Sequence, residues 1–595
     1  MCVEYIIAVL ITSVVISCFG QHSTPIVNIQ GLGSVQGSVG YTAWTNRTIY
    51  EFQGIPYGEA PVGTLRFKPT VKAAAWGGIR DASKPGIRCP QMDKHYVNLD
   101  NEDCLTLSVY SNDVSLNSDR PVMVFMHGGW LFWGGAEQYK PNFLLESNIV
   151  LVVIQYRLGP LGFLSTMSED IPGNVGMLDV ITALEWVQQN IRYFGGSSSQ
   201  VTIFGESAGA VAVSAMLHSP LVQSRSTPLF NKAILQSGSV FVPWAISDDP
   251  IEGTNDIAKR TGCTGVALEQ CLRGVAVKDL LEAFHDHREQ TIISRGYPYV
   301  AGTGLVVGGP SPLFPQHPKN YLENVNKNIA IMAGTTSQDG LFLLNELHKL
   351  QPQLLQTLNT SHALLHYVRI LHEKFGQTKY DGSLEGYAFN QNFLVSETDR
   401  LPWADLVCSL TDVSICGIHG IKAPVMSEVH AFSHVNPGNV YLYSFDYSSE
   451  LIQRNLSVPF PHKRPVHHAE DIKYLFPWEA LDERDVKMAK TVVQLWTSFA
   501  IRGVPSADNV GYWPPVDGIR SHDLGIDLHF KYIFISGLFG PYLKINIESE
   551  QRNNYLNEFY ATADKYRVLG GAGSRLTVSV GSIILVLMIA FSRVL

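Results

Sequence analysis

The sequence predicts an α/β protein built on a large, mostly parallel central sheet flanked by helices. Short apolar, β-rich runs at Val122–Met126 and Val150–Gln155 are typical of strands that are buried on both faces. Before a third such run at Val201–Phe204, residues Val175–Phe194 carry apolar side chains at helical spacing and end at Gly195-Gly196. This strand, helix, strand order predicts a doubly wound sheet covered by helices.

The composition is that of an acidic globular chain. Of its 595 residues, 45% are hydrophobic and 16% are charged, which supplies ample apolar material for a large core. The net charge is -9 and no long Lys/Arg run occurs, so we expect no nucleic-acid partner. No repeat or Pro/Ser-rich linker interrupts the body, which predicts one domain over residues 21–565. We expect no metal ion and no cofactor.

The first twenty residues have the features of a secretory signal peptide. Ile6–Ile16 is apolar, and the small residues Cys18 and Gly20 stand where they would precede cleavage before Gln21. So short an apolar stretch makes a poor membrane-spanning helix. We therefore expect residues 1–20 to be removed and the folded body to be extracellular. Export agrees with three glycan acceptor sequons, at Asn46, Asn359 and Asn455.

The carboxyl end is predicted to attach the protein to a membrane. A run of small residues, Gly570–Ser574, is followed by the apolar segment Leu576–Phe591 near the end of the chain. This order matches the signal for a glycolipid anchor. The tail falls short of the ~20 apolar residues that a spanning helix prefers, although Arg593 could flank such a helix. Residues 566–595 are thus interpreted as an anchor signal, with a single-pass helix or a secreted product as the alternatives.

Disulfide bonds are expected in an oxidising compartment. Loss of the leader would leave six of the eight cysteines, an even number that indicates pairing. Two pairs would each close a short loop: Cys89 with Cys104, and Cys263 with Cys271. On one helix Cys408 and Cys416 would be about 12 Å apart, which exceeds the ~5.5 Å of a disulfide. They can bridge only if the helix breaks between them.

A candidate nucleophile follows the third strand directly, in Gly205-Glu206-Ser207-Ala208-Gly209. Glycines on both sides of Ser207 suit a sharp strand-to-helix turn that holds the serine in strained backbone. A helix-compatible run, Ala210–Leu217, comes next, so NH groups at its start could stabilise negative charge beside the hydroxyl. The pentapeptide alone also fits an ordinary turn, but the flanking strand and helix favour a nucleophile.

Further segments carry a resemblance to a known family. They are Phe52-Gln-Gly-Ile-Pro-Tyr57, Pro61-Val-Gly-Thr-Leu-Arg-Phe67, Glu102-Asp-Cys-Leu105 and Pro172-Gly-Asn-Val-Gly176. Together with the serine pentapeptide they resemble the carboxylesterase and cholinesterase family, over about residues 27–560. The resemblance implies the α/β-hydrolase fold and a serine esterase that acts on small-molecule esters. Its triad would follow the chain order serine, acid, histidine.

The resemblance places the triad acid at Asp339, within Gly334–Gly340. The family usually has Glu there, so the shorter Asp339 must lie closer to its histidine, but either carboxylate orients an imidazole. An Asp-Gly pair without this context would indicate a turn. The resemblance also implies an Arg66–Glu102 ion pair and a hydrogen bond from Ser237 to the acid.

A serine hydroxyl needs a base that takes its proton, and the resemblance places that base in Val466–Phe476. The family pattern sets an acidic residue three positions after the histidine and an aromatic residue beyond it. That register selects His468, with Asp471 in the acidic position. His467 is the alternative, because Glu470 stands at the same offset from it.

Attack on an ester creates a negative oxygen that needs hydrogen-bond donors. By the resemblance they are NH groups of His127-Gly128-Gly129-Trp130 and of Ala208. The family usually has a third glycine where this chain has Trp130. The indole would narrow the acyl pocket or force a different path on the loop.

The expected substrate is an uncharged, partly apolar ester. A cholinesterase would carry a tryptophan between the first two disulfide cysteines, where a quaternary ammonium could bind through cation-π attraction. Residues 89–104 contain none, and Tyr96 is their only aromatic residue, so acetylcholine is not expected as a preferred substrate. The rival hypothesis is a neuroligin-like adhesion protein on the same fold with little or no catalysis; the retained Ser207, Asp339 and His468 favour an enzyme.

Overall fold

The structure is a computed structural model of the chain. It describes residues 25–92, 101–295, 303–339, 421–449, 466–516 and 543–545, apart from residues 243, 248, 266, 326, 337, 338, 448 and 511. Predictions for the leader, the carboxyl-terminal tail, Asn359, Asn455, Cys408 and Cys416 lie outside these residues. Asn46 is exposed, at a turn with φ 55°. No helix within the described ranges is both long and apolar enough to cross a membrane.

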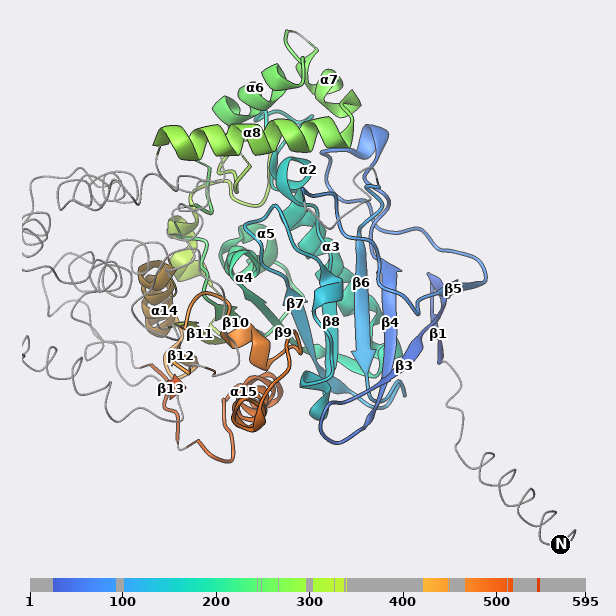
Figure 1. The fold of residues 1–595 in the computed structure, drawn as a ribbon, viewed down its shortest axis with the longest axis vertical. Coiled ribbons are helices and arrows are strands. Elements are labelled where there is room, and N and C mark those ends of the chain that lie inside the picture. Colours follow the sequence, from blue (N-terminus) through green and yellow to red (C-terminus); the bar gives the residue numbers. More distant parts are fainter. Residues whose placement is uncertain are drawn as a thin grey trace, which may run out of the picture.

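The described residues form a ten-stranded sheet and a separate three-stranded one (Figure 1). In spatial order the large sheet contains β13 (Leu543–Ile545), β12 (Val440–Phe445), β11 (Ala330–Thr336), β10 (Lys232–Gln236), β9 (Gly196–Glu206), β7 (Arg120–Met126), β8 (Val150–Ile154), β6 (Thr106–Ser111), β4 (Thr48–Pro56) and β3 (Ser38–Tyr41). The small sheet contains β1 (Ile26–Ile29), β2 (Gly33–Gln36) and β5 (Ile79–Asp81). Neighbours from β13 to β8 pair in parallel, whereas β6, β4 and β3 pair antiparallel at one edge.

The predicted α/β class and mostly parallel sheet are confirmed. The three apolar runs form β7, β8 and β9, and the periodic segment between them forms α3 (Val175–Asn190). The last turn of that segment is a 3-10 helix, η4 (Ile191–Phe194), which ends at Gly195 with a left-handed φ of 79°. Glycine adopts this backbone without steric cost, and it therefore ends the helix where the sequence predicted.

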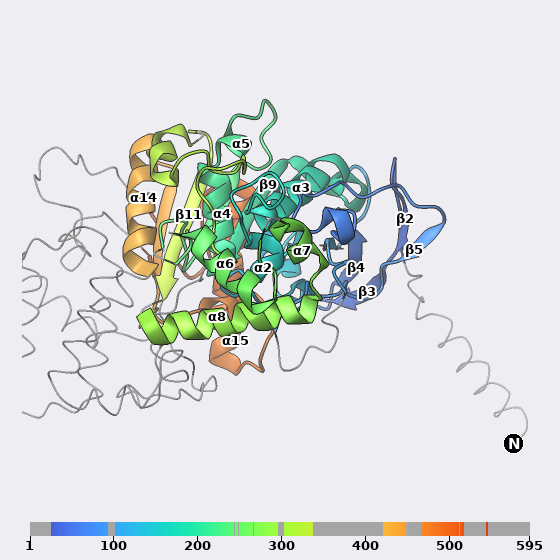
Figure 2. The ribbon, with the colours of Figure 1, turned by 90° about the horizontal axis from the view of Figure 1, so that it is seen from above.

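Helices cover both faces of the large sheet (Figure 2). On one face, α3, α4 (Ala208–His218) and α14 (Ala423–Val435) share a core with Val122, Val124 and Met126 of β7. On the other face, α15 (Glu483–Arg502) shares a core with Met123 and Phe125 of the same strand. Because side chains alternate along a strand, β7 is apolar on both sides, which explains its unbroken hydrophobic sequence.

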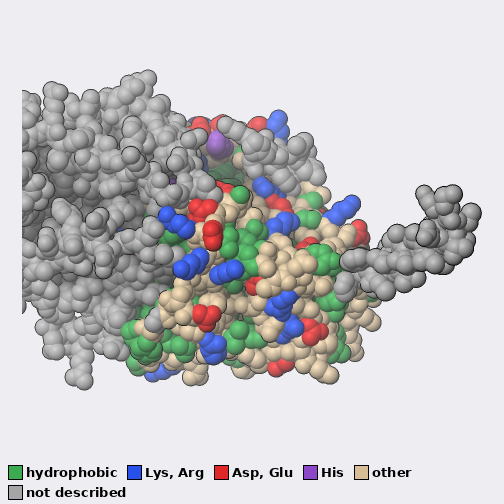
Figure 3. All heavy atoms as spheres, turned by 60° about the horizontal axis from the view of Figure 1, so that its bottom comes forward, with side chains coloured by type: hydrophobic (Ala, Val, Ile, Leu, Met, Phe, Trp, Pro, Cys, Tyr) green, Lys and Arg blue, Asp and Glu red, His purple; other side chains and the backbone are tan. Residues whose placement is uncertain are grey.

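A further group of helices lies beyond one end of the sheet, at the top of Figure 1. It comprises α2 (Gly159–Phe163), α6 (Pro250–Arg260), α7 (Leu268–Gly274) and α8 (Val277–Arg295), which pack around their own apolar cluster. The remaining described helical segments are short: α5 (Pro220–Gln223), η1 (Gly63–Leu65), η2 (Ala136–Gln138), η3 (Leu144–Glu146), η5 (Pro318–Asn324) and η7 (Asp471–Tyr474). On the face drawn in Figure 3, basic and acidic side chains are interspersed among apolar and polar ones.

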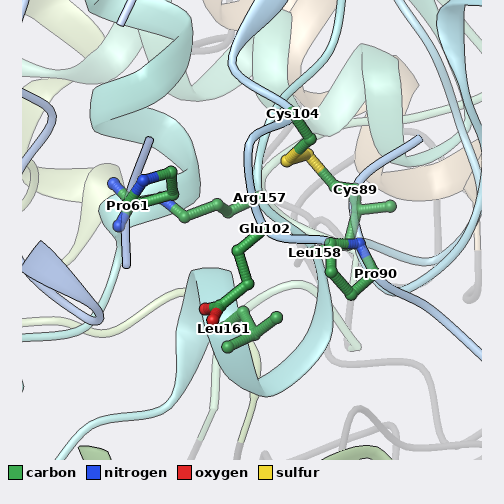
Figure 4. A pocket seen from close by; sticks show the side chains of 8 residues that line it. All are labelled: Pro61, Cys89, Pro90, Glu102, Cys104, Arg157, Leu158 and Leu161. Carbon is green, nitrogen blue, oxygen red and sulfur yellow. A yellow bond between two sulfur atoms is a disulfide. The ribbon is translucent and has the colours of Figure 1, made fainter. Parts of the chain in front are cut away.

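Both short-loop disulfides form as predicted. Cys89 and Cys104 have Cα atoms 5.0 Å apart, and Cys263 and Cys271 have theirs 5.5 Å apart. Figure 4 shows the first bond in a small hollow that Glu102, Arg157 and apolar side chains also line. None of the triad candidates lines this hollow, so it belongs to the scaffold.

Arg66 connects the regions of the two disulfides. Its Nε donates to Glu102 Oε2 at 2.9 Å, beside the first bond. Its Nη1 donates to the carbonyl oxygens of Arg273 and Val275 at 2.9 and 2.6 Å, at the end of α7. The expected Arg66–Glu102 ion pair is therefore present, and it also fixes the chain that follows the second disulfide.

A buried polar contact joins α4 to α14. His218 Nε2 lies 2.8 Å from Glu428 Oε1, and Ser214 Oγ donates to the same oxygen at 2.6 Å. The side chains of His218 and Glu428 are 0% and 1% exposed. The pair therefore fixes α4, the helix that follows the serine turn, against its neighbour on that face of the sheet.

The buried ion pair between Arg157 and Asp179 predicts a large stability effect. Arg157 donates from Nε and Nη2 to the two carboxylate oxygens of Asp179, at 2.8 and 2.7 Å, and both side chains are at most 3% exposed. Asp179→Ala leaves a buried guanidinium without its counter-charge, so the free energy of unfolding should fall by about 3–5 kcal/mol. Urea unfolding followed by tryptophan fluorescence measures this change.

The matched control is Glu282→Ala, which removes an exposed partner of Lys278 on α8. Exposed pairs contribute less than about 1 kcal/mol. A loss for Asp179→Ala no larger than that of the control would contradict the expectation.

Candidate active site

The sheet topology brings the candidate residues to one edge. Ser207 directly follows β9, Asp339 follows β11, and His127 follows β7. These three strands belong to one parallel set, so their carboxyl ends meet at the same edge. His468 lies in the chain between β12 and α15. Residues that lie far apart in the sequence therefore meet above the sheet.

Ser207 occupies a strained turn between β9 and α4, with φ 57° and ψ -123°. A Cβ on Gly209 would lie 1.9 Å from the carbonyl oxygen of Met126, and one on Gly205 would lie 2.5 Å from the carbonyl carbon of Gly209. Neither position therefore has room for a side chain. Such strain persists only where the surroundings enforce it, and it is characteristic of functional sites.

The acid and histidine candidates are in direct contact. His468 Nδ1 lies 2.6 Å from Asp339 Oδ1. The other carboxylate oxygen of Asp339 accepts the amide hydrogen of Thr336 at 3.1 Å, and the aspartate is 0% exposed. The end of β11 thus holds one carboxylate oxygen of Asp339, and the other oxygen orients the imidazole of His468.

The neighbouring histidine is placed differently. His467 Nδ1 lies 2.7 Å from the carbonyl oxygen of His468, and its Nε2 lies 3.3 Å from Glu470 Oε1. Between the two alternatives left by the sequence, the geometry brings His468 to Asp339.

On the opposite edge of the His468 ring lies the carboxylate of Glu206, to which the sequence assigned no role. His468 Nε2 lies 3.2 Å from Glu206 Oε1. Glu206 immediately precedes Ser207, so the nucleophile candidate adjoins this contact. No hydrogen bond joins Ser207 to His468 among the described residues; in free enzymes such bonds often tighten only with substrate.

Carboxylates dominate the electrostatics of His468. Burial alone would lower its pKa, but the negative charges of Glu206, Asp339 and Asp471 outweigh burial and raise the pKa above the ordinary 6.5. A raised pKa favours the imidazolium cation. The site is therefore arranged to stabilise positive charge on the ring.

Asp471 belongs to a buried network behind the triad candidates. It accepts hydrogen bonds from Gln236 Nε2 at 2.9 Å and from the Tyr443 hydroxyl at 2.8 Å. Trp496 Nε1 donates to Gln236 Oε1 at 3.1 Å. Burial raises the pKa of Asp471, and the nearby charge of Asp339 adds to the rise, against the lowering by its hydrogen bonds. The family register marked Asp471 in the sequence, but no local pattern marked Gln236 or Tyr443.

Ser237 does not make the hydrogen bond that the resemblance implied. Its hydroxyl is buried and has no hydrogen-bond partner among the described residues. Its backbone amide instead donates to the Gly334 carbonyl at 2.8 Å. Ser237 therefore ties β10 to β11 through its main chain, and Asp339 receives its amide donor from Thr336.

The candidate oxyanion segment touches the serine. A Cβ on Gly128 would lie 3.1 Å from the Cβ of Ser207 and 2.7 Å from the Glu206 carbonyl oxygen. Ala208 is the first residue of α4, so its amide has no partner within the helix. These positions agree with the requirement that donors lie beside the nucleophile.

His127 orients this segment. Burial lowers the pKa of His127 to about 4, so the ring is neutral at physiological pH. Its Nδ1 lies 2.9 Å from the Gly128 carbonyl oxygen, and the Tyr156 hydroxyl donates to the His127 carbonyl at 2.7 Å. With the Gly128 carbonyl directed at the imidazole, the amide of Gly129 in the same planar peptide points the opposite way.

Trp130 keeps the left-handed backbone that a glycine would adopt there. Its φ is 57°, and the next residue, Leu131, has φ 63°. Gly159 donates its amide to the Leu131 carbonyl at 2.7 Å, and Phe132 and Trp133 donate theirs to Gly129 at 3.0 Å each. These bonds hold two consecutive residues in a backbone region that non-glycine residues rarely adopt.

Comparison with known proteins agrees with this geometry. A family model described as "Carboxylesterase family" matches residues 23–536, so the chain belongs to the carboxylesterase family, whose members share the α/β-hydrolase fold.

Individual relatives include named esterases. The chain is 30% identical to Pyrethroid hydrolase Ces2e of Rattus norvegicus, over 84% of this chain and 86% of the relative. It is 31% identical to Esterase FE4 of Myzus persicae, over 84% and 89%. Glutactin of Drosophila melanogaster is 28% identical over 83% of this chain, which spans about half (49%) of that relative. The family and these esterases support ester hydrolysis as the general chemistry.

The contact between Glu206 and His468 predicts a shift in the pH profile. Because Glu206 raises the pKa of His468, Glu206→Gln should lower that pKa. A general base must be neutral, so activity is lost as pH falls through its pKa. The acid limb of kcat/KM for ester hydrolysis should lie above the ordinary histidine value of 6.5 in the wild type and at lower pH in the variant.

The same pH profile of Glu282→Gln, an exposed position on α8, serves as the control and should match the wild type. An acid limb that stays in place or moves to higher pH in Glu206→Gln would contradict the expectation.

Proposed function

We propose that this protein is a serine carboxylesterase in which Ser207 is the nucleophile, His468 the general base and acid, and Asp339 the orienting carboxylate. The contact of 2.6 Å between His468 Nδ1 and Asp339, beside the strained serine turn, carries the proposal. Family membership and the named esterase relatives support the reaction class.

In the acylation step, Ser207 Oγ attacks the carbonyl carbon of the ester while His468 Nε2 takes the hydroxyl proton. The resulting imidazolium is stabilised by Asp339 and Glu206. Cleavage of the ester C–O bond releases the alcohol, whose oxygen receives the proton from His468. A water molecule then attacks the acyl-enzyme, gives its proton to His468, and frees the carboxylic acid as Ser207 regains a proton.

The negative oxygen of both tetrahedral intermediates would be stabilised by the amides of Gly129, Trp130 and Ala208. The placement of Gly128 against Ser207 and the start of α4 at Ala208 support this role. The loss of one such donor typically costs about 10²- to 10³-fold in rate.

We further propose an uncharged ester as the substrate. The loop closed by Cys89 and Cys104 offers no tryptophan for a quaternary ammonium. Acetylcholine should consequently be a poor substrate, and rapid saturable turnover of acetylcholine would refute this part of the proposal.

An adhesion or binding role on the same fold is the second candidate. One observation favours it: Trp130 stands in the oxyanion segment. It predicts a folded protein without esterase activity, which the following experiment separates from the first proposal.

Ser207→Ala should abolish hydrolysis of p-nitrophenyl acetate, with a fall in kcat of at least about 10³-fold, because the hydroxyl that forms the acyl-enzyme is removed. Release of nitrophenolate measures the rate. A purified, folded wild type without activity would support the binding role.

The adjacent histidines provide a matched pair of variants. His468→Ala should lose activity to a similar degree, while His467→Ala should retain most of it, because His468 is the histidine whose Nδ1 lies 2.6 Å from Asp339. Loss of activity in His467→Ala but not in His468→Ala would assign the general base to His467.

For localisation, we propose an extracellular protein held by a glycolipid anchor that replaces residues after Gly570–Ser574. A phosphatidylinositol-specific phospholipase should then release the protein from intact cells. Retention after treatment would favour a spanning helix, and protein already in the medium would favour a secreted product.

A further inference from the structure

The side chain of Trp130 packs against a second tryptophan. The rings of Trp130 and Trp244 have centroids 4.9 Å apart and an angle of 51° between their planes. Trp130 is 8% exposed and Trp244 is 1% exposed. We refer to these two side chains as the indole pair.

Each tryptophan of the indole pair belongs to one of the two chain segments that lie beside Ser207. Trp130 follows Gly128, whose added Cβ would lie 3.1 Å from Ser207 Cβ. Trp244 follows Gly238, whose added Cβ would lie 2.2 Å from the Ser207 carbonyl oxygen. The second segment is also tied to α4, because Val240 donates its amide to Ser214 Oγ at 2.9 Å. The two indoles thus join the oxyanion segment to the chain on the other side of the nucleophile.

The direction of the Trp130 side chain is set by its backbone. The left-handed φ of 57° and the hydrogen bonds that hold the following turn leave the indole in the core cluster with Trp244. Trp133, three residues later, is 48% exposed. The segment therefore buries one tryptophan and leaves another largely in solvent.

An acyl chain must lie close to the oxyanion donors. The chain and the negative oxygen are bonded to the same carbon, and donors lie about 2.7–3.1 Å from that oxygen. Trp130 supplies one of the proposed donors, so its backbone borders the space that the acyl carbons enter, and its indole packs on Trp244. A glycine at this position would leave that space open.

On the basis of the proposed esterase function, we infer that the indole pair closes the acyl side of the site and restricts the enzyme to esters of short acids, of the acetyl class. Longer acyl chains are excluded by the volume of Trp130. The alcohol portion of the ester is not restricted by this contact.

The test compares p-nitrophenyl acetate, butyrate and octanoate, which share one leaving group. In the wild type, kcat/KM should fall at least about tenfold from acetate to octanoate, since small misfits in an apolar pocket cost this much or more. Trp130→Gly suits the left-handed backbone and keeps the amide donor. It should raise the octanoate-to-acetate ratio at least about tenfold.

Glu282→Ala, at an exposed position on α8 outside the oxyanion segment, is the control, and it should leave the ratio unchanged. Trp244→Phe gives a second way to reduce the indole pair and should raise the butyrate-to-acetate ratio. Near-ultraviolet circular dichroism checks that each variant is folded. The wild-type ratio tests the inference even if a variant does not fold.

Wild-type turnover of octanoate equal to that of acetate overturns the inference, as does an unchanged ratio in folded Trp130→Gly. In both cases the proposed function stands, provided that activity depends on Ser207. Absence of activity toward all three esters, or full activity in Ser207→Ala, would instead overturn the proposed function itself.

Discussion

The close approach of β7 to the start of α4 is the constraint on which the candidate site depends. A side chain at Gly209 would collide with the Met126 carbonyl, and one at Gly128 would collide with the carbonyl of Glu206. Because both positions are glycine, the end of β7 and the serine turn come into contact. This contact sets Ser207 in its strained backbone and places the candidate oxyanion amides beside it. Asp339 and His468 can act on Ser207 only if they are placed correctly with respect to this turn.

The electrostatic consequence is a histidine surrounded by carboxylates. Glu206 and Asp339 approach opposite edges of the His468 ring, at 3.2 and 2.6 Å. The negative charge of Asp471 also raises the pKa of His468. In a buried site such charges are screened less than at a surface. They therefore outweigh the lowering of the His468 pKa by burial and raise that pKa. The arrangement favours the imidazolium that a serine hydrolase forms transiently. It would serve no evident purpose in a protein that only binds a partner.

Much of this architecture follows from local sequence signals. The apolar runs predicted β7, β8 and β9, the glycines around Ser207 predicted the sharp turn, and the short cysteine spacings predicted two disulfides. Family register then paired Asp339 with His468. What local patterns could not show were contacts between side chains of distant elements. The Glu206–His468 contact, the Gln236–Asp471–Tyr443 network and the packing of Trp130 on Trp244 each depend on how separate strands and loops meet in space.

The two departures from the family pattern affect which substrate fits the site more than which reaction it catalyses. Asp339 is shorter than the usual glutamate, yet it contacts His468 and is held by Thr336. Trp130 keeps the left-handed backbone of a glycine but adds a large side chain that packs against Trp244.

The central claim, that Ser207 is a nucleophile activated by His468, is tested most directly by reaction with a phosphonate ester followed by peptide mass spectrometry. The account predicts stoichiometric labelling of Ser207 in the wild type and strongly slowed labelling in His468→Ala. Absence of label on Ser207 in folded wild-type protein would contradict it.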